Sequence, residues 1–180
     1  MNYEARTKEV RRKVLDMLLK EKEGHIGGCF SETDILISLY DNVLMPEDKF
    51  ILSKGHACYT LYVLLKEKGL NPPIKPHPDI CEKEGISCTT GSLGHGFPIG
   101  VGMALARKLK NKEGKIYVLI GDGECQEGTT WESALLASHH KLNNLVIIID
   151  HNKLQALQPI DEVTSLGNLR DKFLSFGFEV

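Results

Sequence analysis

Two apolar runs, at 115–120 and 145–149, constrain the fold of this chain more than any other feature. Each has the length and character of a buried strand. The segment between them has room for one helix, which makes a strand–helix–strand unit. Such a unit places its two strands in one parallel sheet, through a right-handed connection. The sequence therefore predicts an α/β fold in which a parallel sheet is flanked by helices on both faces.

Both runs are followed by a loop that carries a hard oxygen ligand. Asp122 lies in the segment GDGE at 121–124, and Asn152 lies in DHNKL at 150–154. The carboxyl ends of neighbouring parallel strands form the edge where open α/β sheets bind ligands. A carboxylate, an amide oxygen and a backbone carbonyl near Leu154 suit Mg²⁺, and the amides around Gly123 could hold phosphate. The spacing therefore favours a metal–diphosphate site over two structural turns.

Hydrophobic periodicity and turn residues predict the remaining elements. We expect helices at 4–22, 31–43, 57–68 and 99–109, with Ser31 as the cap of the second. The last of these is apolar nearly all round, which predicts a central, buried helix. A strand is predicted at 50–53, a long ordered loop at 70–90, short helices near 166–170 and 173–174, and the start of a strand at 176–180. In the helix between the two apolar runs, the inner face is predicted to carry Trp131, Ala134, Leu135, Ser138 and Leu142.

Composition and charge restrict the function class. The 180 residues suffice for one domain, and a net charge of −2 gives no reason to expect nucleic acid or an anionic membrane as partner. No apolar run approaches the roughly 20 residues that span a bilayer, and the amino terminus lacks a signal peptide. The five cysteines form no C-x-x-C pair, which is typical of reduced thiols. We expect a cytoplasmic protein.

Three histidines, His25, His56 and His77, lie in or next to loops. A single histidine of this kind is more often a capping or surface residue. Three of them at the turns of an α/β edge make a functional role and a structural role equally good interpretations. Histidine suits proton transfer and hydroxyl binding near neutral pH. The glycines at 94–100 do not match the dinucleotide pattern G-x-G-x-x-G, and the histidines at 139–140 lack the zinc pattern H-E-x-x-H. Glu127, taken alone, is best interpreted as a solvated acid at a helix start.

Taken in order, several motifs resemble the amino-terminal, thiamine-diphosphate-binding domain of transketolase. The resemblance covers nearly the whole chain. It is carried by GHIGG at 24–28 with Ser31 and Asp34, FILSKGH at 50–56, TGSLGHG at 90–96, GDGECQEG at 121–128, and DHNK at 150–153. Two positions depart from the usual family pattern: Ile26 stands in place of proline, and His95 in place of glutamine.

The resemblance implies a cofactor, thiamine diphosphate, held through Mg²⁺ or Ca²⁺. It implies that Asp122, Asn152 and the Leu154 carbonyl bind the metal, and that His25, His56 and His77 are catalytic. It also implies that Glu127 lies at an interface between cofactor sites. The residues implied in cofactor binding are His56, Gly91, Ser92, Leu93, Gly121, Asp122, Gly123, Glu124, Asn152 and Leu154.

The activity implied is transfer of a two-carbon ketol unit from a ketose to an aldose, with sugar phosphates as substrates. Against the family pattern, 1–180 forms a single pyrophosphate-binding domain that ends early, without the pyrimidine-binding and carboxyl-terminal domains. We therefore expect a partner polypeptide that resembles the other half of transketolase, in a homodimer or heterotetramer. Two alternatives stay open: a non-catalytic or regulatory cofactor-binding protein, and a component of a deoxyxylulose-phosphate synthase or an α-keto acid decarboxylating enzyme.

Overall fold

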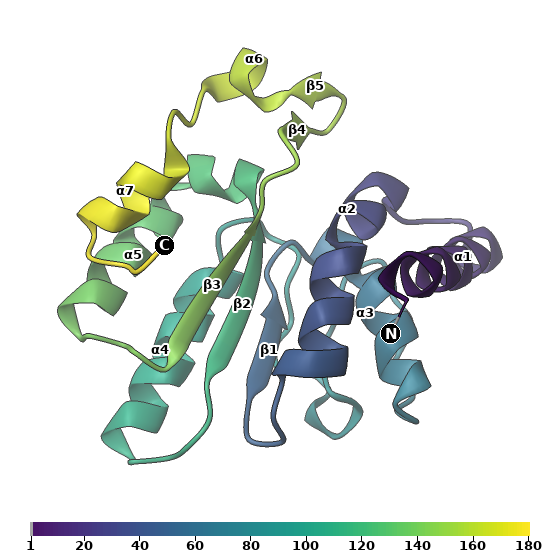
Figure 1. The fold of residues 1–180 in the computed structure, drawn as a ribbon, viewed down its shortest axis with the longest axis horizontal. Helices are drawn as coiled ribbons and strands as arrows, with labels where there is room; N and C mark the ends of the chain where they lie inside the picture. The colour runs from purple at the N-terminus through teal and green to yellow at the C-terminus, as the bar shows by residue number, and fades with distance from the viewer. Residues whose placement is uncertain (1) are drawn as a thin grey trace.

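Three parallel strands form the centre of the computed structural model, which describes residues 2–180 (Figure 1). They are β1 (Lys49–Leu52), β2 (Ile116–Gly121) and β3 (Leu145–Asp150), hydrogen-bonded in the order β1-β2-β3. Gly121 pairs with Asp150 at the end of the ladder, so the loops after β2 and β3 leave the same edge of the sheet. The predicted α/β class, with both apolar runs as neighbouring parallel strands, is confirmed.

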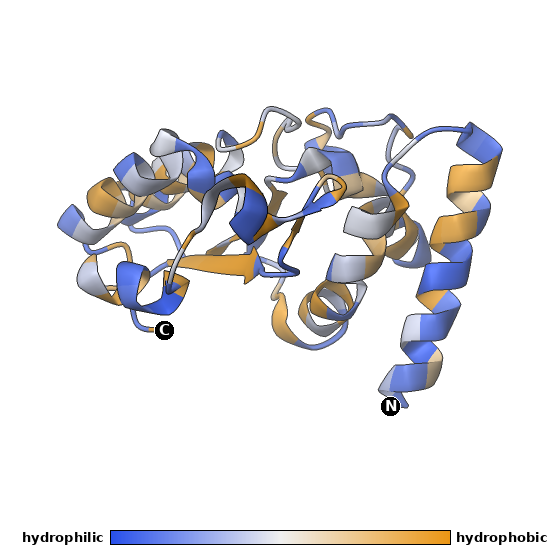
Figure 2. Ribbon diagram, turned by 90° about the horizontal axis from the view of Figure 1, so that it is seen from above, coloured by the Kyte–Doolittle hydropathy of each residue, from blue (hydrophilic) through white to orange (hydrophobic). Residues whose placement is uncertain are grey.

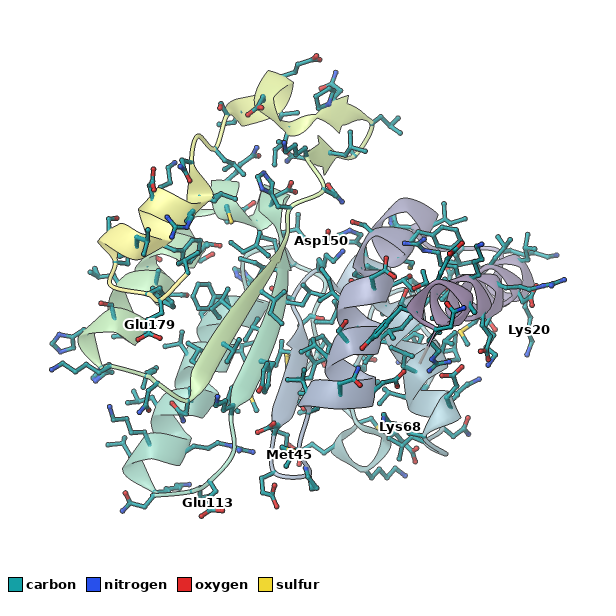
Figure 3. The ribbon with its side chains drawn as sticks, in the orientation of Figure 1. Lys20, Met45, Lys68, Glu113, Asp150 and Glu179 are labelled. Atoms are coloured by element: carbon teal, nitrogen blue, oxygen red, sulfur yellow. The ribbon has the colours of Figure 1, made fainter. Side chains whose placement is uncertain are left out.

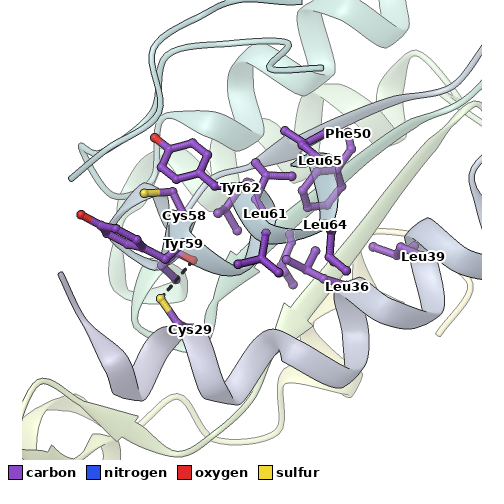
Figure 4. Packing of buried hydrophobic residues seen from close by; sticks show 14 of the residues in the cluster. Cys29, Leu36, Leu39, Phe50, Cys58, Tyr59, Leu61, Tyr62, Leu64 and Leu65 are labelled. Carbon is purple, nitrogen blue, oxygen red and sulfur yellow. Dashed lines mark hydrogen bonds between the residues drawn. The ribbon is translucent and has the colours of Figure 1, made fainter. Parts of the chain in front are cut away.

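Alternation along the strands divides the core into two clusters, because successive strand residues point to opposite faces. Phe50 and Leu52 of β1, with Leu119 of β2, belong to a cluster shared with α1 (Tyr3–Glu21), α2 (Ile26–Ser38) and α3 (Cys58–Glu67). Figure 4 shows part of this packing, with the Cys29 thiol of α2 donating to the Ala57 carbonyl.

The opposite face packs on a second set of helices. Ile51, Val118 and Ile120 belong to a cluster formed with α4 (Gly96–Leu109), α5 (Gly128–His139) and α7 (Leu169–Ser175). The two helical layers lie on either side of the sheet in Figure 1, and the view from above in Figure 2 shows the apolar β3 in orange between them. Helices therefore flank both faces, as predicted.

Short elements complete the chain. A π-helical turn (Leu39–Val43) follows α2, and single 3₁₀ turns occupy Gly55–Ala57, Glu82–Glu84 and Asp122–Gln126. After β3 the chain forms a small antiparallel hairpin of β4 (Leu154–Gln155) and β5 (Gln158–Pro159), then α6 (Ile160–Thr164). The hairpin and α6 lie beyond the carboxyl edge of the sheet (Figure 1). Across residues 2–180, no helix is long and apolar enough to cross a membrane.

Four local predictions are wrong. The second helix begins at Ile26 rather than at Ser31, whose hydroxyl donates to Asp150 instead of capping a helix. Residues 176–180 are not a strand: the backbone turns at Gly177 (φ 85°), and Phe178 packs on Phe173 with ring centroids 5.5 Å apart. Helix α4 is not buried all round, since Ile99 and Leu109 are exposed. Leu135 of α5 is also exposed and does not belong to the inner face of that helix.

Candidate functional site

The loops after β2 and β3 are joined by a direct hydrogen bond. The Lys153 amide donates to Asp122 Oδ2 at 2.8 Å, while the Gly123 amide donates to Asp122 Oδ1 at 2.9 Å. Asn152 Oδ1 accepts from the Leu154 amide at 2.8 Å. Asp122 is buried and the Asn152–Leu154 segment is exposed, so the loop of the first candidate ligand is fixed inside the fold and that of the second faces solvent. We call Asp122, Asn152 and the Leu154 carbonyl the oxygen clamp.

Local geometry orients the clamp. Asp122 begins a 3₁₀ turn directly after β2, which aims its carboxylate back toward the amides of the sheet edge. Lys153 adopts a left-handed backbone conformation (φ 63°), which turns the chain sharply after Asn152 and brings its own amide to Asp122. Each engaged oxygen keeps lone-pair capacity, since carboxylate and amide oxygens accept more than one bond.

Glu124 faces inward and is fully partnered. Its carboxylate accepts from the Ser53 hydroxyl at 2.5 Å, the Gly94 amide at 2.9 Å and the Gly121 amide at 2.8 Å. Burial raises the pKa of this carboxyl, and the three donors and the Lys54 charge act in the opposite direction. Glu124 therefore joins the loops after β1 and β2 to the Gly94 loop, and its predicted contact with a cofactor stays a prediction.

The three predicted histidines lie around the ends of β1 and α2. The rings of His25 and His56 meet edge to face with centroids 5.2 Å apart. His77 reaches the same edge from the 70–90 loop. Its ring packs closely on Gly91, where an added Cβ would lie 2.9 Å from the ring. His25 and His77 are exposed and His56 is half-buried. The structure thus brings the histidines together with Gly91, one of the predicted cofactor residues.

His56 stands in an environment that disfavours its charged form. Burial lowers the pKa of His56 to about 4, and the charges of Lys54, His25 and His77 act in the same direction. A histidine with this pKa is neutral at pH 7, so one ring nitrogen donates a hydrogen bond and the other accepts one. The site therefore offers a neutral imidazole beside two solvent-accessible ones.

Sequence reasoning missed a buried ionic cluster between the histidines and the clamp. Lys54 Nζ lies 2.5 Å from Asp150 Oδ2 and 3.1 Å from Glu32 Oε2, and the Ser31 hydroxyl donates to Asp150 Oδ1 at 2.7 Å. Figure 3 shows Asp150 at the top of β3, between the sheet and α2. The available signal was a lysine two residues after the apolar run FIL at 50–52, together with an acid on the inner face of a helix.

The other predicted residues lie along the same edge. Ser92 is exposed and Leu93 is half-buried in the loop before α4, and the Leu154 side chain is exposed at the start of β4. Glu127 is exposed beside Gly94, because a Cβ on that glycine would lie 2.8 Å from Glu127 Cβ. The sequence-predicted residues therefore gather at one edge of the sheet, in two groups that the Lys54 cluster connects.

The donor set of the clamp fits a hard cation and a phosphate. It offers a carboxylate, an amide oxygen and a backbone carbonyl, the ligand types that Mg²⁺ and Ca²⁺ take in proteins. A Cβ on Gly123 would meet nothing closer than 3.7 Å, so the backbone there is open to a ligand. Within residues 2–180, no three His, Cys, Asp or Glu side chains gather as a metal site.

Comparison with protein families gives one match across the chain. The family model described as "Transketolase, thiamine diphosphate binding domain" matches residues 3–180. Among curated proteins, the chain is 38% identical to a subunit of the apulose-4-phosphate transketolase of Phocaeicola vulgatus, over 98% of this chain and 70% of that protein. It is also 38% identical to 6-deoxy-6-sulfo-D-fructose transketolase subunit SqwG of Clostridium sp., over 95% of this chain and 70% of that protein.

Solved structures give the same result for the fold. Transketolase from Leishmania mexicana aligns with a TM-score of 0.88 at 25% identity, and transketolase from Campylobacter jejuni with 0.85 at 30% identity. Each alignment covers 99% of this chain but only 31% and 33% of the longer chains, respectively. The similarity is therefore confined to about a third of each of these longer proteins.

Proposed function

Because this chain belongs to the transketolase family, as its thiamine diphosphate binding domain, we propose that it works with a partner chain to transfer a two-carbon ketol unit from a ketose to an aldose. The observation that carries the proposal is the oxygen clamp at the carboxyl edge, with the histidines at the same edge. The full activity is proposed for the assembly.

In this proposal the clamp holds the diphosphate end of the cofactor. Asp122, Asn152 and the Leu154 carbonyl bind Mg²⁺ or Ca²⁺, and the Gly123 amide faces phosphate. His56, Gly91, Ser92, Leu93, Gly121 and Glu124 belong to the cofactor-binding wall, Glu124 through the loops that it joins. When bound, thiamine diphosphate supplies the ring carbon that carries the two-carbon unit, and the metal neutralises the diphosphate.

The histidines act on substrate hydroxyls and on the proton that moves with them. His56, neutral at pH 7, can accept a proton at one ring nitrogen while its other nitrogen holds a hydroxyl or phosphate oxygen. His25 and His77, exposed at either side, orient the sugar and shield the reacting end from water. This division follows from their burial and from the contact of His25 with His56.

The partner is proposed to be a polypeptide resembling the pyrimidine-binding half of transketolase, in a heterotetramer or with a dimer of this chain. Two similar proteins are named as transketolase subunits, which supports a two-chain enzyme. Exposed apolar side chains on α4 and α5, such as Leu109, Leu135 and Leu136, are suitable for such a contact. The interpretation of 1–180 as a single domain is part of this proposal, and so is a role for Glu127 at the interface.

The substrate class follows from the names of the relatives. One name carries a ketose phosphate and another a sulfonated ketose. We propose a ketose with a terminal anionic group as donor for this chain. In this proposal the partner holds most of the anion, because the carboxyl edge of the sheet is assigned to the cofactor and to the substrate hydroxyls.

The test is cofactor binding and ketol transfer with the partner present. Titration with thiamine diphosphate and Mg²⁺ should show metal-dependent binding, and Asp122→Asn should weaken it at least about tenfold, or about 1.4 kcal/mol. Asp16→Asn, an exposed acid on α1, is the matched control and should bind like the parent chain.

Three outcomes would contradict the proposal. Consumption of pyruvate in place of ketose phosphates would assign the chain to a deoxyxylulose-phosphate synthase or an α-keto acid decarboxylating enzyme. Binding without any turnover in the complete assembly would favour a regulatory role. Ketol transfer by the purified chain alone would contradict the need for a partner.

A further inference from the structure

We propose that Lys54 is a positioning residue, a buried cation that fixes the first turn of α2, directly after His25, against the strand end that precedes Asn152 of the oxygen clamp. The residue is only 3% exposed, although lysine is normally a surface residue. This inference rests on the proposed function for its consequence in cofactor binding. The contacts of Lys54 with Gly28, Glu32 and Asp150 are present in the structure whatever the function of the chain.

Two elements meet at the Lys54 ammonium: α2, through Gly28 and Glu32, and the end of β3, through Asp150. The ammonium donates to the Gly28 carbonyl at 3.2 Å, which lies three residues after His25. It donates to Asp150 Oδ2 at 2.5 Å, at the end of β3 and two residues before Asn152. It also forms an ion pair at 3.1 Å with Glu32 of α2. Two of these contacts are hydrogen bonds, and the third is an ion pair by distance only, because Glu32 Oε2 has no hydrogen-bond partner among the described residues.

The charges of the cluster are compatible with a fixed cation. Burial acts to lower the pKa of Lys54, but Glu32 and Asp150 together raise it above its usual value. Burial raises the pKa of Glu32, since no part of that residue reaches solvent, and the Lys54 charge acts in the opposite direction. Lys54 therefore balances Asp150, which has a second partner in Ser31.

A buried cluster of this kind is a poor source of stability. Removing two charges from water costs about as much as their attraction returns, and apolar residues of similar volume often serve better. The established use of such groups is to select one arrangement of the elements that they join. Here the elements joined are α2, whose first turn follows His25, and the end of β3.

Lys54 also acts on His56, two residues further along the chain. The charged groups that face His56 are Lys54, His25 from the loop before α2, and His77 from the 70–90 loop. After burial, the Lys54 charge is the next cause of the lowered pKa. Lys54 therefore has two effects that can be measured separately, one on the geometry of the cofactor edge and one on the protonation of His56.

The experiment compares Lys54→Met with two other variants. In the chain without cofactor, the His56 ring signal is followed by NMR against pH and identified by its loss in His56→Gln. In the chain with its partner, affinity for thiamine diphosphate is measured in the presence of Mg²⁺. Glu32→Gln keeps the contacts of Lys54 with Gly28 and Asp150. Val14→Ala, in the core of α1, reports the effect of lost stability alone.

The expected results separate positioning from stability. Lys54→Met should raise the midpoint of the His56 titration by about half a pH unit or more and weaken cofactor affinity about tenfold or more. Val14→Ala should change neither value. Glu32→Gln should leave cofactor affinity within about twofold, and Lys54→Arg should restore part of the loss, because it keeps the cation.

Several outcomes would overturn the inference. An unchanged His56 midpoint, or a loss of affinity no larger than in Val14→Ala, would remove the positioning role. If Lys54→Met does not fold, the double variant Lys54→Met/Glu32→Gln leaves one fewer uncompensated acid and takes its place. If both fail to fold, Lys54 serves stability and the inference is wrong. If the unchanged chain does not bind cofactor, the proposed function fails while the His56 titration still tests Lys54.

Discussion

At the scale of single residues, His56 links the site to the pH dependence of folding. Its folded pKa of about 4 lies below the ordinary value of about 6.5. As the pH falls, His56 therefore becomes protonated at a higher pH in the unfolded chain than in the folded chain. The stabilisation by neutral His56 is complete above about pH 6.5 and is lost as the pH decreases toward 4.

His56→Gln should remove this contribution. We expect the loss of unfolding free energy between pH 7 and pH 4.5 to be smaller in the variant by about 1 to 3 kcal/mol. Urea unfolding at the two pH values measures it. His139→Gln, at the exposed end of α5, should keep the pH dependence of the parent chain. An unchanged pH dependence in His56→Gln would contradict the assigned environment of the imidazole.

Which site residues could be predicted depends on what their chemistry reveals in sequence. Asp122 and Asn152 were predictable because each lies within a few residues of the end of an apolar run, and strand ends define the binding edge. Lys54 and Ser31 were not, because a lysine in a turn and a serine before an acid both have commoner surface roles. Their function comes from contacts with Asp150, which lies 96 and 119 residues away along the chain.

At the scale of elements, α4 packs against β1 through a glycine that admits no side chain. A Cβ on Gly96 would lie 2.6 Å from Ser53 Cα, so a backbone atom stands in the way. Gly96→Ala should therefore destabilise the chain by about 1 to 3 kcal/mol and move the Gly94 loop. Urea unfolding measures the stability, and amide exchange at Gly94 reports the loop.

Gly102, on the same helix, is the matched control. Nothing lies within 4 Å of a Cβ placed there, and the residue is exposed. Gly102→Ala should stabilise by about 0.5 to 1 kcal/mol, because alanine is the better helix former. Equal effects of the two substitutions would mean that α4 does not approach β1 as described.

The start of α2 shows where local patterns mislead. The segment 24–30 contains three glycines, and glycine costs about 1 kcal/mol in a helix, so the sequence favours a turn there. The folded chain overrides this preference with tertiary contacts. The Cys29 thiol donates to the Ala57 carbonyl, and the Thr60 hydroxyl donates to the Cys29 carbonyl at 2.8 Å. Neither contact can be deduced from the segment itself.

At the scale of the whole molecule, an aromatic cluster attaches α7 and the residues after it to α5. Phe173 of α7 is 4% exposed and lies 5.4 Å from the ring of Trp131, whose indole donates to the Cys125 carbonyl. Phe173→Ala should release α7 locally at a cost of about 3 to 5 kcal/mol. The fluorescence of Trp131, the single tryptophan, should shift to the red as it gains solvent.

Leu174 provides the comparison for this substitution. It is adjacent in sequence but 40% exposed, so Leu174→Ala should cost less than about 1 kcal/mol and leave the fluorescence unchanged. A red shift in both variants would indicate that α7 is held by its helix rather than by the aromatic cluster.

The layers of the molecule were predictable and its final segment was not. Apolar runs and their order determine a parallel sheet with helices on both faces, and strand alternation then assigns the core. The alternating pattern at 176–180 is too short to carry the same information. The turn at Gly177 and the packing of Phe178 on Phe173 decide its conformation instead.

The pairing of Gly121 with Asp150 makes the clamp insensitive to changes in chain length elsewhere. Its two halves are 30 residues apart in sequence, yet strand register sets the separation of the two loops that carry them. An insertion in the turn between α5 and β3 would lengthen the chain without moving either ligand. A slip of one residue in β3 would turn Asp150 away from Lys54 and Ser31 and would shift the loop that carries Asn152 relative to Asp122. Loop length is thus free to diverge or to be engineered, while the register of two strands is not.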